Sequence, residues 1–470
     1  MRSDRPLESR TGGRAATTGV IPGDIAISVG NPNSPLPVGW EWRLLTDLAR
    51  LETGHTPSRR HPEYWGGSVP WVGIRDATGN HGGTIYETAQ YTNELGIRNS
   101  SARVLPANTV CLSRTASVGY VVVMGVPMAT SQDFVNWVCG PDLDYRYLKY
   151  VLLGERRSFL RFASGTTHQT IYFPEVKAFH IALPPREVQV SIADILGALD
   201  DRINLLRQTN TTLESIAQAL FKSWFIDFDP VRAKQAGGKP EGMDAAMAAL
   251  FPAEFEESAL GLIPKGWSVL PFSETVDIVG GGTPKTSVPE YWDGDIPWFS
   301  VVDAPAAGQV FTVATEKSVT KLGVDNSSTR ILPMWTTIIS ARGTVGKLAL
   351  TGVEMAMNQS CYGLRPRASG GETTTYLAAQ RLVEDLKRLA HGGVFDTITR
   401  DTLNSVLVCN PPSEIIKAFD ALTRPLFERI LANGLQSRSL TETRDTLLPR
   451  LISGKLRLPE AQEQLEDALA

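Results

Sequence analysis

Apolar residues recur at every seventh position between Arg186 and about Phe225, in a stretch with almost no helix-breaking residue. Ile195 and Ile216 each follow one of these positions by three residues. Heptad spacing of this kind is typical of a helix that packs along another helix. The stretch therefore predicts a long helix with a coiled-coil-like seam. The repeating seam positions are Ile192, Leu199, Leu206, Leu213 and Leu220.

A second stretch near the C-terminus has the same spacing, with two interruptions. Pro425 removes a helix hydrogen bond, and the pair Asn433-Gly434 places a polar and a flexible residue in the series, so we expect a kink or a weaker segment. Leu422 takes the intermediate position. Two helices of about 40 residues, each about 60 Å long, are more easily buried against each other, although packing of each on its own domain is the alternative. The apolar seam positions here are Phe419, Leu426, Leu440 and Leu447.

Short runs of β-branched and aromatic residues, broken by glycine, proline and asparagine, precede each long helix. Such runs are typical of strands, whereas residues 147–162 and 374–390 have helical patterns. The chain is thus predicted to have an α+β fold, with two tandem β-rich domains that are each followed by a long helix. The predicted strand segments include residues 69–74, 110–112, 120–124, 134–139, 336–340 and 347–350.

The chain repeats itself at an offset of 227 residues. Residues 36–77 align with residues 263–304 without a gap, and 15 of these 42 positions are identical. The phrase Pro-Glu-Tyr-Trp, followed by Pro-Trp, occurs at residues 62–71 and again at 289–298. The same offset still pairs Pro184-Pro185 with Pro411-Pro412, where each long helix is predicted to begin. A register kept over this length indicates tandem duplication of a whole unit.

The duplication divides the chain into domains and connecting segments. Residues 1–35 have no counterpart in the repeat, so we expect a poorly ordered N-terminal arm. The first β-rich domain spans residues 36–185 and the second spans residues 263–412. Between them lie a central long-helix region, 186–230, and an Ala/Gly/Glu-rich linker with room for a short helix, 231–262. Residues 413–470 form the C-terminal helix region.

Composition places the chain among ordinary globular proteins. Of its 470 residues, 42% are hydrophobic and 20% are charged, and the length suits two to four domains. Neither an apolar run of transmembrane length nor an apolar segment behind the basic N-terminus occurs, so we expect no membrane span and no secretory signal. Four widely separated cysteines fit reduced thiols better than a disulfide framework or a zinc site. These features predict a cytoplasmic protein.

Charge alone does not favour a nucleic-acid partner. The formal net charge is −4. Residues 36–185 contain 14 basic and 12 acidic residues, and residues 263–412 contain 13 and 14. A DNA-binding hypothesis must therefore rest on the organisation of the chain and on local loops.

The ordered motifs of the two copies carry a specific resemblance. Each copy has Pro-x-Gly-Trp, then Gly-x-Thr-Pro, then Tyr-Trp-x-Gly-x-(Ile/Val)-Pro-Trp, and finally Pro-Pro before a long helix. The first helix closes with Leu-Phe-Lys-Ser-Trp-Phe-Ile-Asp-Phe-Asp-Pro-Val at 220–231, and the second with Leu-Leu-Pro-Arg-Leu-Ile-Ser-Gly-Lys at 447–455. Together they resemble the specificity subunit of a type I restriction–modification enzyme, over roughly residues 36–457.

That resemblance implies a division of labour between the parts of the chain. The β-rich domains would be target-recognition domains, each reading one half of a bipartite, asymmetric site in double-stranded DNA. The two helices would pair as an antiparallel coiled coil, act as a ruler and dock two methyltransferase subunits. The chain itself would be non-catalytic and would bind no cofactor. S-adenosylmethionine, ATP and Mg²⁺ are expected in the methyltransferase and restriction/translocase partner subunits.

The internal copy separates frame positions from candidate reading positions. Positions at which the copies agree are expected to maintain the frame that both copies share. Loops at which the copies differ are expected to suit different bases. Within the repeated frame, residues 58–61 are Ser-Arg-Arg-His and residues 285–288 are Lys-Thr-Ser-Val. Arginine donates bidentately to guanine, and either cation can hold a phosphate. For each single residue, a solvated surface loop is the alternative.

Two further loops differ between the copies in the same way. Residues 113–117 correspond to 340–344, and residues 165–170 correspond to 392–397. Hydroxyl, imidazole and amide groups can contact base edges, whereas Phe395 can only stack or wedge. The candidate DNA-binding residues are Ser58, Arg59, Arg60, His61, Arg75, Arg114, Thr115, Thr167, His168, Gln169, Lys285, Thr286, Ser287, Arg342, Thr344, Lys347, Phe395 and Asp396.

The aromatic residues shared by the copies are expected to belong to the frame. Heads that read different sequences have no reason to share their base contacts, and tryptophan and tyrosine bury large areas against proline. We therefore predict a packing role for them. They are Trp40, Tyr64, Trp65 and Trp71, with the counterparts Trp267, Tyr291, Trp292 and Trp298.

Some motifs in the sequence partly match those of other protein classes. Asn410-Pro411-Pro412-Ser413 lacks the aromatic residue of a methyltransferase loop and fits a helix entrance better. Asp142 with Glu175 and Lys177 loosely matches a nuclease pattern, but the second copy does not repeat it. A duplicated Trp-rich carbohydrate-binding module and a protein scaffold remain the alternatives to DNA recognition.

Overall fold

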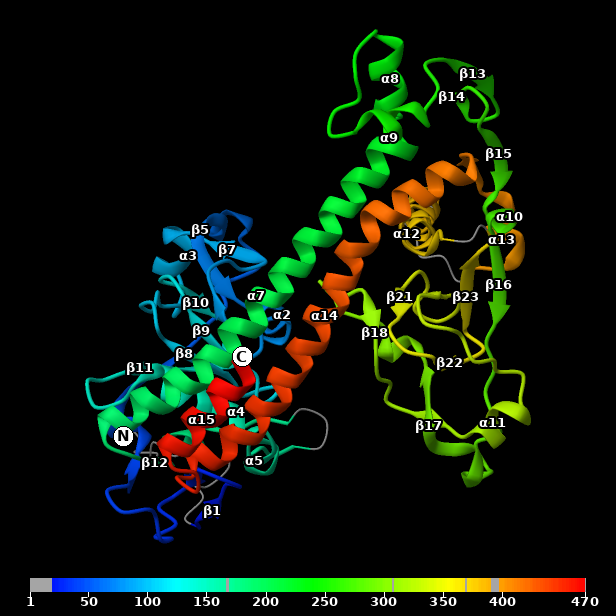
Figure 1. The fold of residues 1–470 in the computed structure, drawn as a ribbon. Coiled ribbons are helices and arrows are strands. Elements are labelled where there is room, and N and C mark those ends of the chain that lie inside the picture. Colours follow the sequence, from blue (N-terminus) through cyan, green and yellow to red (C-terminus); the bar gives the residue numbers. More distant parts are fainter. Residues whose placement is uncertain (1–18, 166–168, 307, 368–369, 390–396, 470) are drawn as a thin grey trace. The chain divides into compact units, whose positions relative to one another are not determined.

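The duplication in the sequence is repeated in the secondary structure of the computed structural model. The structure describes residues 19–165, 169–306, 308–367, 370–389 and 397–469. Two compact units divide the chain: unit 1 contains residues 1–201 and 440–470, and unit 2 contains residues 202–439. The long helices α7 (Arg186–Phe225) and α14 (Ser413–Ile452) each contribute to both units (Figure 1).

Unit 1 contains three sheets. The first has the order β1 (Ile21–Pro22), β2 (Ile27–Val29), β12 (Phe179–Leu183), β3 (Glu41–Leu44). The second has the order β10 (Ala129–Thr130), β5 (Trp65–Val72), β7 (Gln90–Thr92). The third has the order β4 (Ala49–Thr53), β11 (Phe134–Cys139), β8 (Val110–Ser113), β9 (Val121–Met124), β6 (Thr84–Ile85). Its shorter helices are α1 (Leu45–Leu48), the 3₁₀ turn η1 (Pro62–Tyr64), α2 (Ile74–Gly79), α3 (Glu94–Arg98), α4 (Tyr145–Gly154), α5 (Arg156–Phe162), α6 (Phe173–Lys177) and α15 (Leu458–Leu469).

Unit 2 repeats this plan with two differences in its sheets. Within the described residues of unit 2, the counterpart of the first sheet consists of β15 (Ser268–Pro271) and β24 (Leu407–Asn410), and a separate hairpin joins β13 (Phe255–Ser258) to β14 (Gly261–Pro264). The other sheets have the orders β19 (Ser318–Val319), β17 (Trp292–Phe299), β22 (Ala356–Met357) and β16 (Val276–Gly280), β23 (Cys361–Pro366), β20 (Thr337–Ser340), β21 (Leu348–Thr351), β18 (Phe311–Thr312). Its shorter helices are α8 (Asp229–Gln235), α9 (Ala245–Ala249), α10 (Phe272–Thr275), η2 (Pro289–Tyr291), η3 (Val301–Asp303), α11 (Lys321–Asp325), α12 (Glu372–Leu389) and α13 (Arg400–Ser405).

Part of the core of each unit lies between its five-stranded sheet and a helix that covers that sheet. Strand β9 is a continuous apolar run and β8 is apolar except for Ser113, and every residue in both strands is buried, as expected for strands covered on both faces. Helix α4 packs on them through buried residues such as Tyr147 and Leu148. In unit 2, α12 covers β20, β21 and β23 in the same way. The predicted β-rich domains are thus present in both copies.

The two long helices pack together in antiparallel orientation. In unit 1, Asp200 of α7 accepts from Arg444 of α14 at 2.8 Å. In unit 2, Asn433 of α14 donates to Asn210 of α7 at 2.8 Å. A later residue of α7 thus contacts an earlier residue of α14, which confirms the predicted antiparallel helix pair. Predicted seam residues that are buried are Ile192, Leu199, Leu206, Phe419, Leu440 and Leu447, whereas Leu213, Leu220 and Leu426 are half-buried.

The second position of the seam differs from the sequence expectation. Ile195 is buried, as predicted, but Ile216 is 44% exposed and Leu422 is 39% exposed, so neither of these two lies in the seam. The buried positions fall one residue later, at Ala217 and Thr423. The series on α7 is Leu196, Ile203, Asn210, Ala217 and Trp224. The next seam position after each heptad position therefore lies four residues later, rather than the predicted three. The following heptad position comes three residues after that.

The two interruptions of the second helix have different outcomes. Helix α14 runs unbroken from Ser413 to Ile452, and Figure 1 shows a bend in the half that begins at Ser413, the half to which Pro425 belongs by sequence. A proline inside a helix lacks the N–H group and bends the helix in this way. Asn433 causes no break, because it is buried and hydrogen-bonded to Asn210.

Part of the expected N-terminal arm belongs to unit 1. Residues 21–29 form β1 and β2, and β2 pairs with β12. Ala26, Ile27 and Val29 are buried. The absence of a repeat counterpart led to the expectation of an arm, but these apolar residues close an open sheet edge. Residues 1–18 of the predicted arm lie outside the described residues.

The linker predicted at 231–262 is packed on unit 2. It contains most of α8, all of α9 and β13, and the first half of β14. Val231 and Phe251 are buried in an aromatic cluster with Trp224 and Trp267. Alanine and glycine content alone suggested a flexible segment, whereas its few large apolar residues fold it back onto the core.

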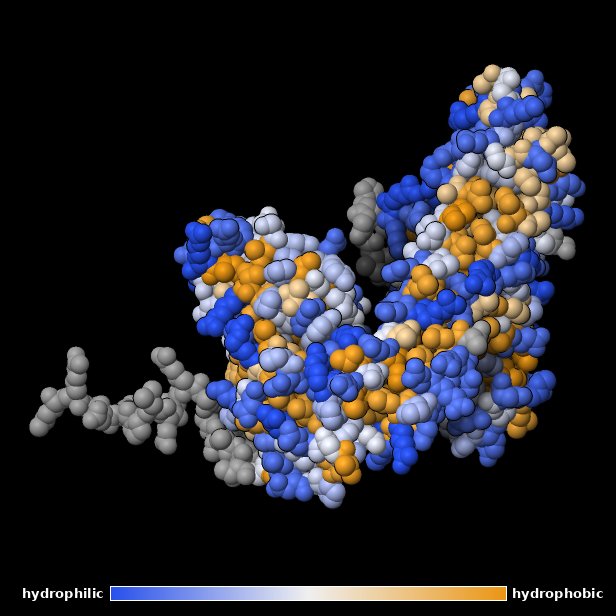
Figure 2. Space-filling view, turned by 60° about the vertical axis from the view of Figure 1, so that its left-hand side comes forward, coloured by the Kyte–Doolittle hydropathy of each residue, from blue (hydrophilic) through white to orange (hydrophobic). Residues whose placement is uncertain are grey.

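The face drawn in Figure 2 has hydrophilic residues interspersed with apolar patches. Among the described residues, no helix is long and apolar enough to cross a membrane.

Candidate nucleic-acid interface

The repeated aromatic phrase holds the backbone of the variable loop in each unit. In unit 1 the rings of Trp65 and Trp71 meet edge to face at 5.2 Å. The Trp71 Nε1 donates to the carbonyl of His55 at 3.1 Å, and the Trp65 Nε1 to that of Ser58 at 3.5 Å. Two positions of the loop that precedes η1 are therefore tied to the same indole pair.

Unit 2 has the same arrangement around a different loop. We call this pair of indoles, which binds the loop backbone, the tryptophan mount. Trp292 and Trp298 meet edge to face at 5.1 Å. The Trp298 Nε1 donates to the Gly282 carbonyl at 3.0 Å, and the Trp292 Nε1 donates to the Lys285 carbonyl at 3.2 Å. These bonds involve only backbone acceptors in the loop, so the loop side chains are free to differ.

The shared aromatic residues are not all core residues. Trp71, Trp267 and Trp298 are buried, as predicted. Trp40, Tyr64, Trp65, Tyr291 and Trp292 are half-buried. The half-buried indoles Trp65 and Trp292 keep one side accessible beside the variable loops.

A cation covers the half-buried tryptophan in both units. In unit 1 the guanidinium carbon of Arg59 lies 4.6 Å from the Trp65 ring and 5.4 Å from the Trp71 ring. Its Nη2 also donates to Gln90 Oε1 at 2.9 Å. Stacking on the indole orients the exposed guanidinium without occupying all of its donors.

Unit 2 supplies this cation from another segment, directly before β19. The position of Arg59 is taken by Thr286, and the position of Gln90 is taken by Lys317. The Lys317 Nζ lies 6.0 Å from the Trp292 ring. Sequence reasoning missed Lys317, although the 227-residue offset that pairs it with Gln90 was available as a signal.

The neighbouring loop residues in both units are solvent-accessible. Ser58, Arg60, His61, Lys285, Thr286 and Ser287 are exposed. His61 stacks on Tyr64 at 4.8 Å and lies 2.9 Å from the Glu63 carboxylate. These two contacts hold His61 at the edge of the loop.

Arg114 ties the loops of unit 1 together. Its Nη2 donates to the Gln132 carbonyl at 3.1 Å, and its Nη1 donates to the Ile171 carbonyl at 3.5 Å. Its guanidinium carbon lies 4.6 Å from the Phe173 ring. Partial burial lowers the pKa of Arg114. These contacts give the half-buried Arg114 a positioning role between loops rather than a freely exposed charge.

Three loops of unit 1 meet around Gln132. The Thr56 hydroxyl donates to Gln132 Oε1. Thr115 forms an isolated bridge with Thr170, and the Ala116 N–H donates to the Gln169 carbonyl at 3.2 Å. The structure therefore brings residues 54–61, 113–117 and 169–171 to one end of the unit.

Arg75 lies close to this group of loops. It is exposed near the start of α2, directly after β5. The Val72 carbonyl at the end of β5 accepts from the Ser131 N–H at 3.0 Å, which places this strand end beside the Gln132 segment.

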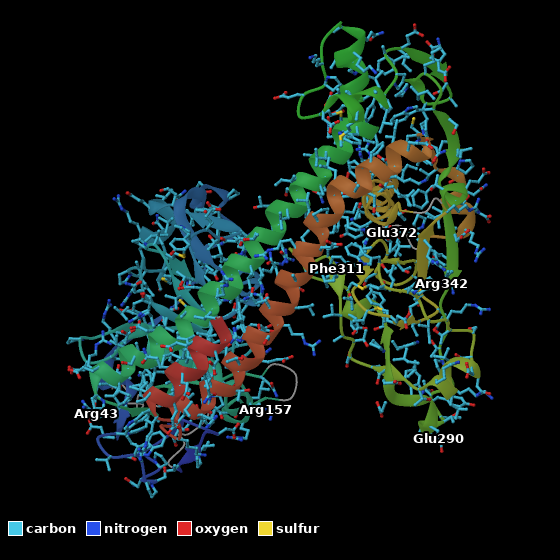
Figure 3. All side chains as sticks on the ribbon, viewed as in Figure 1. Arg43, Arg157, Glu290, Phe311, Arg342 and Glu372 are labelled. Carbon is cyan, nitrogen blue, oxygen red and sulfur yellow. The ribbon has the colours of Figure 1, made fainter. Side chains whose placement is uncertain are left out.

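Unit 2 assembles the corresponding loops. The Thr283 hydroxyl donates to Gln359 Oε1, and the Ala341 N–H donates to the Ser360 carbonyl at 2.7 Å. Arg342 forms an isolated bridge with Thr397. Arg342, Thr344 and Lys347 are exposed, and Figure 3 labels Arg342 among the side chains of this unit. The predicted residues Thr167, His168, Phe395 and Asp396 lie outside the described residues.

The two units also correspond to the two regions that a family comparison identifies. The family described as "Type I restriction modification DNA specificity domain" matches residues 37–215 and 264–432. The chain belongs to this family. It is a type I specificity subunit with two tandem recognition domains.

Named relatives support this membership. The HindI specificity subunit of Haemophilus influenzae is 32% identical over 334 residues, which cover 62% of this chain and 72% of that protein. The MjaIX specificity subunit of Methanocaldococcus jannaschii is 26% identical over 433 residues, or 90% of this chain and 95% of that protein. The crystal structure of the specificity subunit from M. genitalium covers 90% of this chain and 98% of its own, with a TM-score of 0.55 and 16% identity. None of these similarities supports the carbohydrate-binding or scaffold alternatives.

Proposed function

We propose that this specificity subunit selects the DNA target of a type I restriction–modification complex. Each recognition domain reads one half of a bipartite, asymmetric site in double-stranded DNA. The observation that carries this proposal is the repeated tryptophan mount, which holds Ser58–His61 in one unit and Lys285–Val288 in the other. One frame with two different loops is suited to two different half-sites.

The loop chemistry supports contacts of two kinds. An arginine held over an indole, as Arg59 is, presents the edge of a planar fork that matches the N7 and O6 acceptors of guanine. Lys317 presents a single ammonium group, which suits a phosphate or one base acceptor. The difference in shape between these two cations is one source of different half-site preferences.

The paired helices are proposed to set the distance between the half-sites and to dock two methyltransferase subunits. Buried polar contacts support a fixed helix register. The Asn433 amide meets Asn210, and Asp200 meets Lys149 at 3.2 Å as well as Arg444 at 2.8 Å. Polar pairs of this kind disfavour a sliding of one helix along the other.

The subunit is further proposed to be non-catalytic and to bind no cofactor of its own. In this scheme S-adenosylmethionine, ATP and Mg²⁺ bind to the methyltransferase and restriction/translocase subunits, in the cytoplasm. In the described part of the chain, His, Cys, Asp and Glu form no group of three suited to a metal ion. Asn410-Pro411-Pro412 directly precedes α14, so its position also suits a helix entrance.

The proposal is tested by mapping DNA modification in cells that carry this chain with its partner subunits. We expect adenine methylation at a split, asymmetric sequence with a spacer of constant length. A control strain lacks only this chain and should show no such modification. Methylation at a continuous palindrome, or unchanged methylation in the control strain, would contradict the proposal.

A further inference from the structure

A glutamine that both copies share stands among the loops that differ between them. Gln132 and Gln359 occupy equivalent positions at the 227-residue offset, and both are exposed. In unit 1 the Thr56 hydroxyl donates to Gln132 Oε1, and in unit 2 the Thr283 hydroxyl donates to Gln359 Oε1. We call each of these two a Thr–Gln pair. The pairs are identical in residue type and in contact, whereas the loops beside them are not.

The glutamine lies at the second position of the same tight turn in both units. The Phe134 N–H donates to the Ser131 carbonyl at 3.3 Å, and the Cys361 N–H donates to the Asn358 carbonyl at 3.2 Å. Each bond closes a four-residue turn. Strands β11 and β23 begin at the last residue of the turn, so each glutamine is placed by a strand of the five-stranded sheet.

The threonine is held by the tryptophan mount. In unit 1 the His55 N–H donates to the Thr130 carbonyl at 2.8 Å, and the His55 carbonyl accepts from the Trp71 indole at 3.1 Å. Gly282, the counterpart of His55, makes both bonds in unit 2, each at 3.0 Å. A buried proline follows the threonine in each unit and restricts its backbone. The two segments that form the Thr–Gln pair are therefore fixed in the same way twice.

Stability does not account for this exposed pair. A hydrogen bond between exposed side chains competes with water and adds little net stability, and holding a glutamine in one rotamer costs side-chain entropy. The backbone bonds described above already join the two segments. A surface bond that occurs in both units therefore indicates a role for the atoms that it orients.

The bond to threonine leaves the amide donors of the glutamine available. Oxygen and nitrogen lie on opposite branches of the planar amide, so Nε2 is directed away from the threonine when Oε1 faces it. Among the described residues, nothing accepts a hydrogen bond from either Nε2. Asp133, the acid next to Gln132, instead accepts from the Ser131 hydroxyl at 3.0 Å. Each unit thus presents an oriented amide with two N–H donors.

Basic residues of the variable loops lie beside each pair. In unit 1 Arg114 donates to the carbonyl of the glutamine at 3.1 Å, and Arg59 lies three residues after the threonine. In unit 2 Lys285 lies two residues after the threonine. Arg342 lies beside the turn, because the N–H of the residue before it donates to the Ser360 carbonyl at 2.7 Å. Donors among cations are suited to an anionic acceptor.

We propose that each glutamine donates to a phosphate oxygen of the DNA backbone and so fixes the register of its recognition domain on the half-site. The proposal rests on the function proposed above, in which both domains bind double-stranded DNA. A contact that is the same in two domains that read different bases fits the part of the duplex that does not vary, its sugar–phosphate backbone. Glutamine is a regular donor to phosphate, and such contacts position a protein without reading sequence.

Gln132→Glu separates the amide donors from the bond to threonine. Glutamate can still accept from the Thr56 hydroxyl, but it has no N–H group and repels phosphate. Binding of duplex DNA by the full chain, assembled with its partner subunits, should weaken about tenfold or more, with an unchanged midpoint of thermal unfolding. Gln359→Glu should have the same effect through the second half-site. Gln462→Glu, at an exposed position of α15, is the matched control and should bind DNA as the unaltered chain does.

Modified DNA distinguishes a phosphate contact from a base contact. When single phosphates are replaced by uncharged methylphosphonates, one position in the first half-site should weaken binding by the unaltered chain about tenfold. The same replacement should affect Gln132→Ala less than about twofold, because the contact is already lost. Base changes should weaken both proteins by equal factors. If Q132A relaxes the base preference instead, the glutamine reads a base and the phosphate assignment is wrong.

The remaining outcomes separate this inference from the proposed function. If Q132E and Q359E bind DNA normally and bipartite methylation persists, the inference fails and the function stands. If the unaltered complex does not bind duplex DNA, the function fails first. If Q132E binds DNA normally but no longer binds a methyltransferase, the glutamine contacts that subunit and the phosphate assignment is wrong.

Discussion

At the scale of single residues, the structure separates the side chains that carry the loops from those that are free to contact DNA. Arg114 was grouped with the DNA-binding candidates because of its charge, but its guanidinium is bound to two carbonyl groups and stacked on Phe173. Arg59 has the opposite character, since it is exposed and held in place by an indole. Only the three-dimensional neighbours distinguish these two arginines.

Arg59 and Lys317 should each affect one half-site. Arg59→Ala is expected to weaken binding to the first half-site by about 1–3 kcal/mol, because a bidentate base contact or an oriented phosphate contact is lost. Lys317→Ala should affect the second half-site instead. Binding of DNA probes altered in one half-site at a time measures both effects.

Arg98→Ala provides the matched control for these variants. Arg98 is an exposed arginine of unit 1 that pairs with Glu94 on the surface of α3, so its loss should leave both half-sites unchanged. Equal losses at both half-sites for Arg59→Ala would show a general charge effect and contradict the assignment.

At the scale of elements, sequence patterns identified the long helices but misplaced part of their seam. The heptad leucines could be recognised in the sequence, whereas the alternate positions include Asn210, Ala217 and Thr423, which have little or no apolar signal. Asn433 looked like an interruption because its partner Asn210 is 223 residues away. The strands β1 and β2 were missed for a related reason, since they have no repeat copy to reveal them.

The buried asparagine pair should contribute both stability and register. Asn433→Leu leaves the Asn210 Oδ1 without its buried donor, so we expect a loss of about 1–3 kcal/mol in the free energy of unfolding. The double variant Asn210→Leu with Asn433→Leu should recover much of this loss. Chemical denaturation measures the effect. Asn204→Leu, on the exposed face of α7, is the control and should change little. A double variant as unstable as the sum of both single variants would contradict the pairing argument.

At the scale of the whole molecule, the duplication can be predicted from the sequence, whereas the structural difference between the two copies cannot. Fifteen identical positions between residues 36–77 and 263–304 establish the repeat. The filled sheet edge of unit 1 and the open edge of unit 2 follow from long-range contacts, such as those of Glu155 with residues 24–27. No local sequence pattern predicts a contact between segments that are so far apart in the chain.

The helix pair should determine the spacer of the DNA site. Inserting seven residues into both α7 and α14 keeps the seam in phase and lengthens the pair by about 10 Å, or about three base pairs. Methylation mapping should then show a longer spacer with both half-site sequences unchanged. An insertion of equal length in the turn between β13 and β14 is the control and should leave the spacer unaltered. A changed half-site sequence after the helix insertion would show that the helices do not act as the ruler.

The division of the chain between the two units has a consequence for its synthesis on the ribosome. Unit 2 is one continuous stretch, residues 202–439, whereas unit 1 needs residues 440–470 as well as residues 1–201. Trp40 packs beside Gly454, and Asp200 binds Arg444, so these contacts of the first domain form only after nearly the whole chain has been made. The domain translated first is therefore completed last, and a chain that loses its final segment leaves its N-terminal half unfinished.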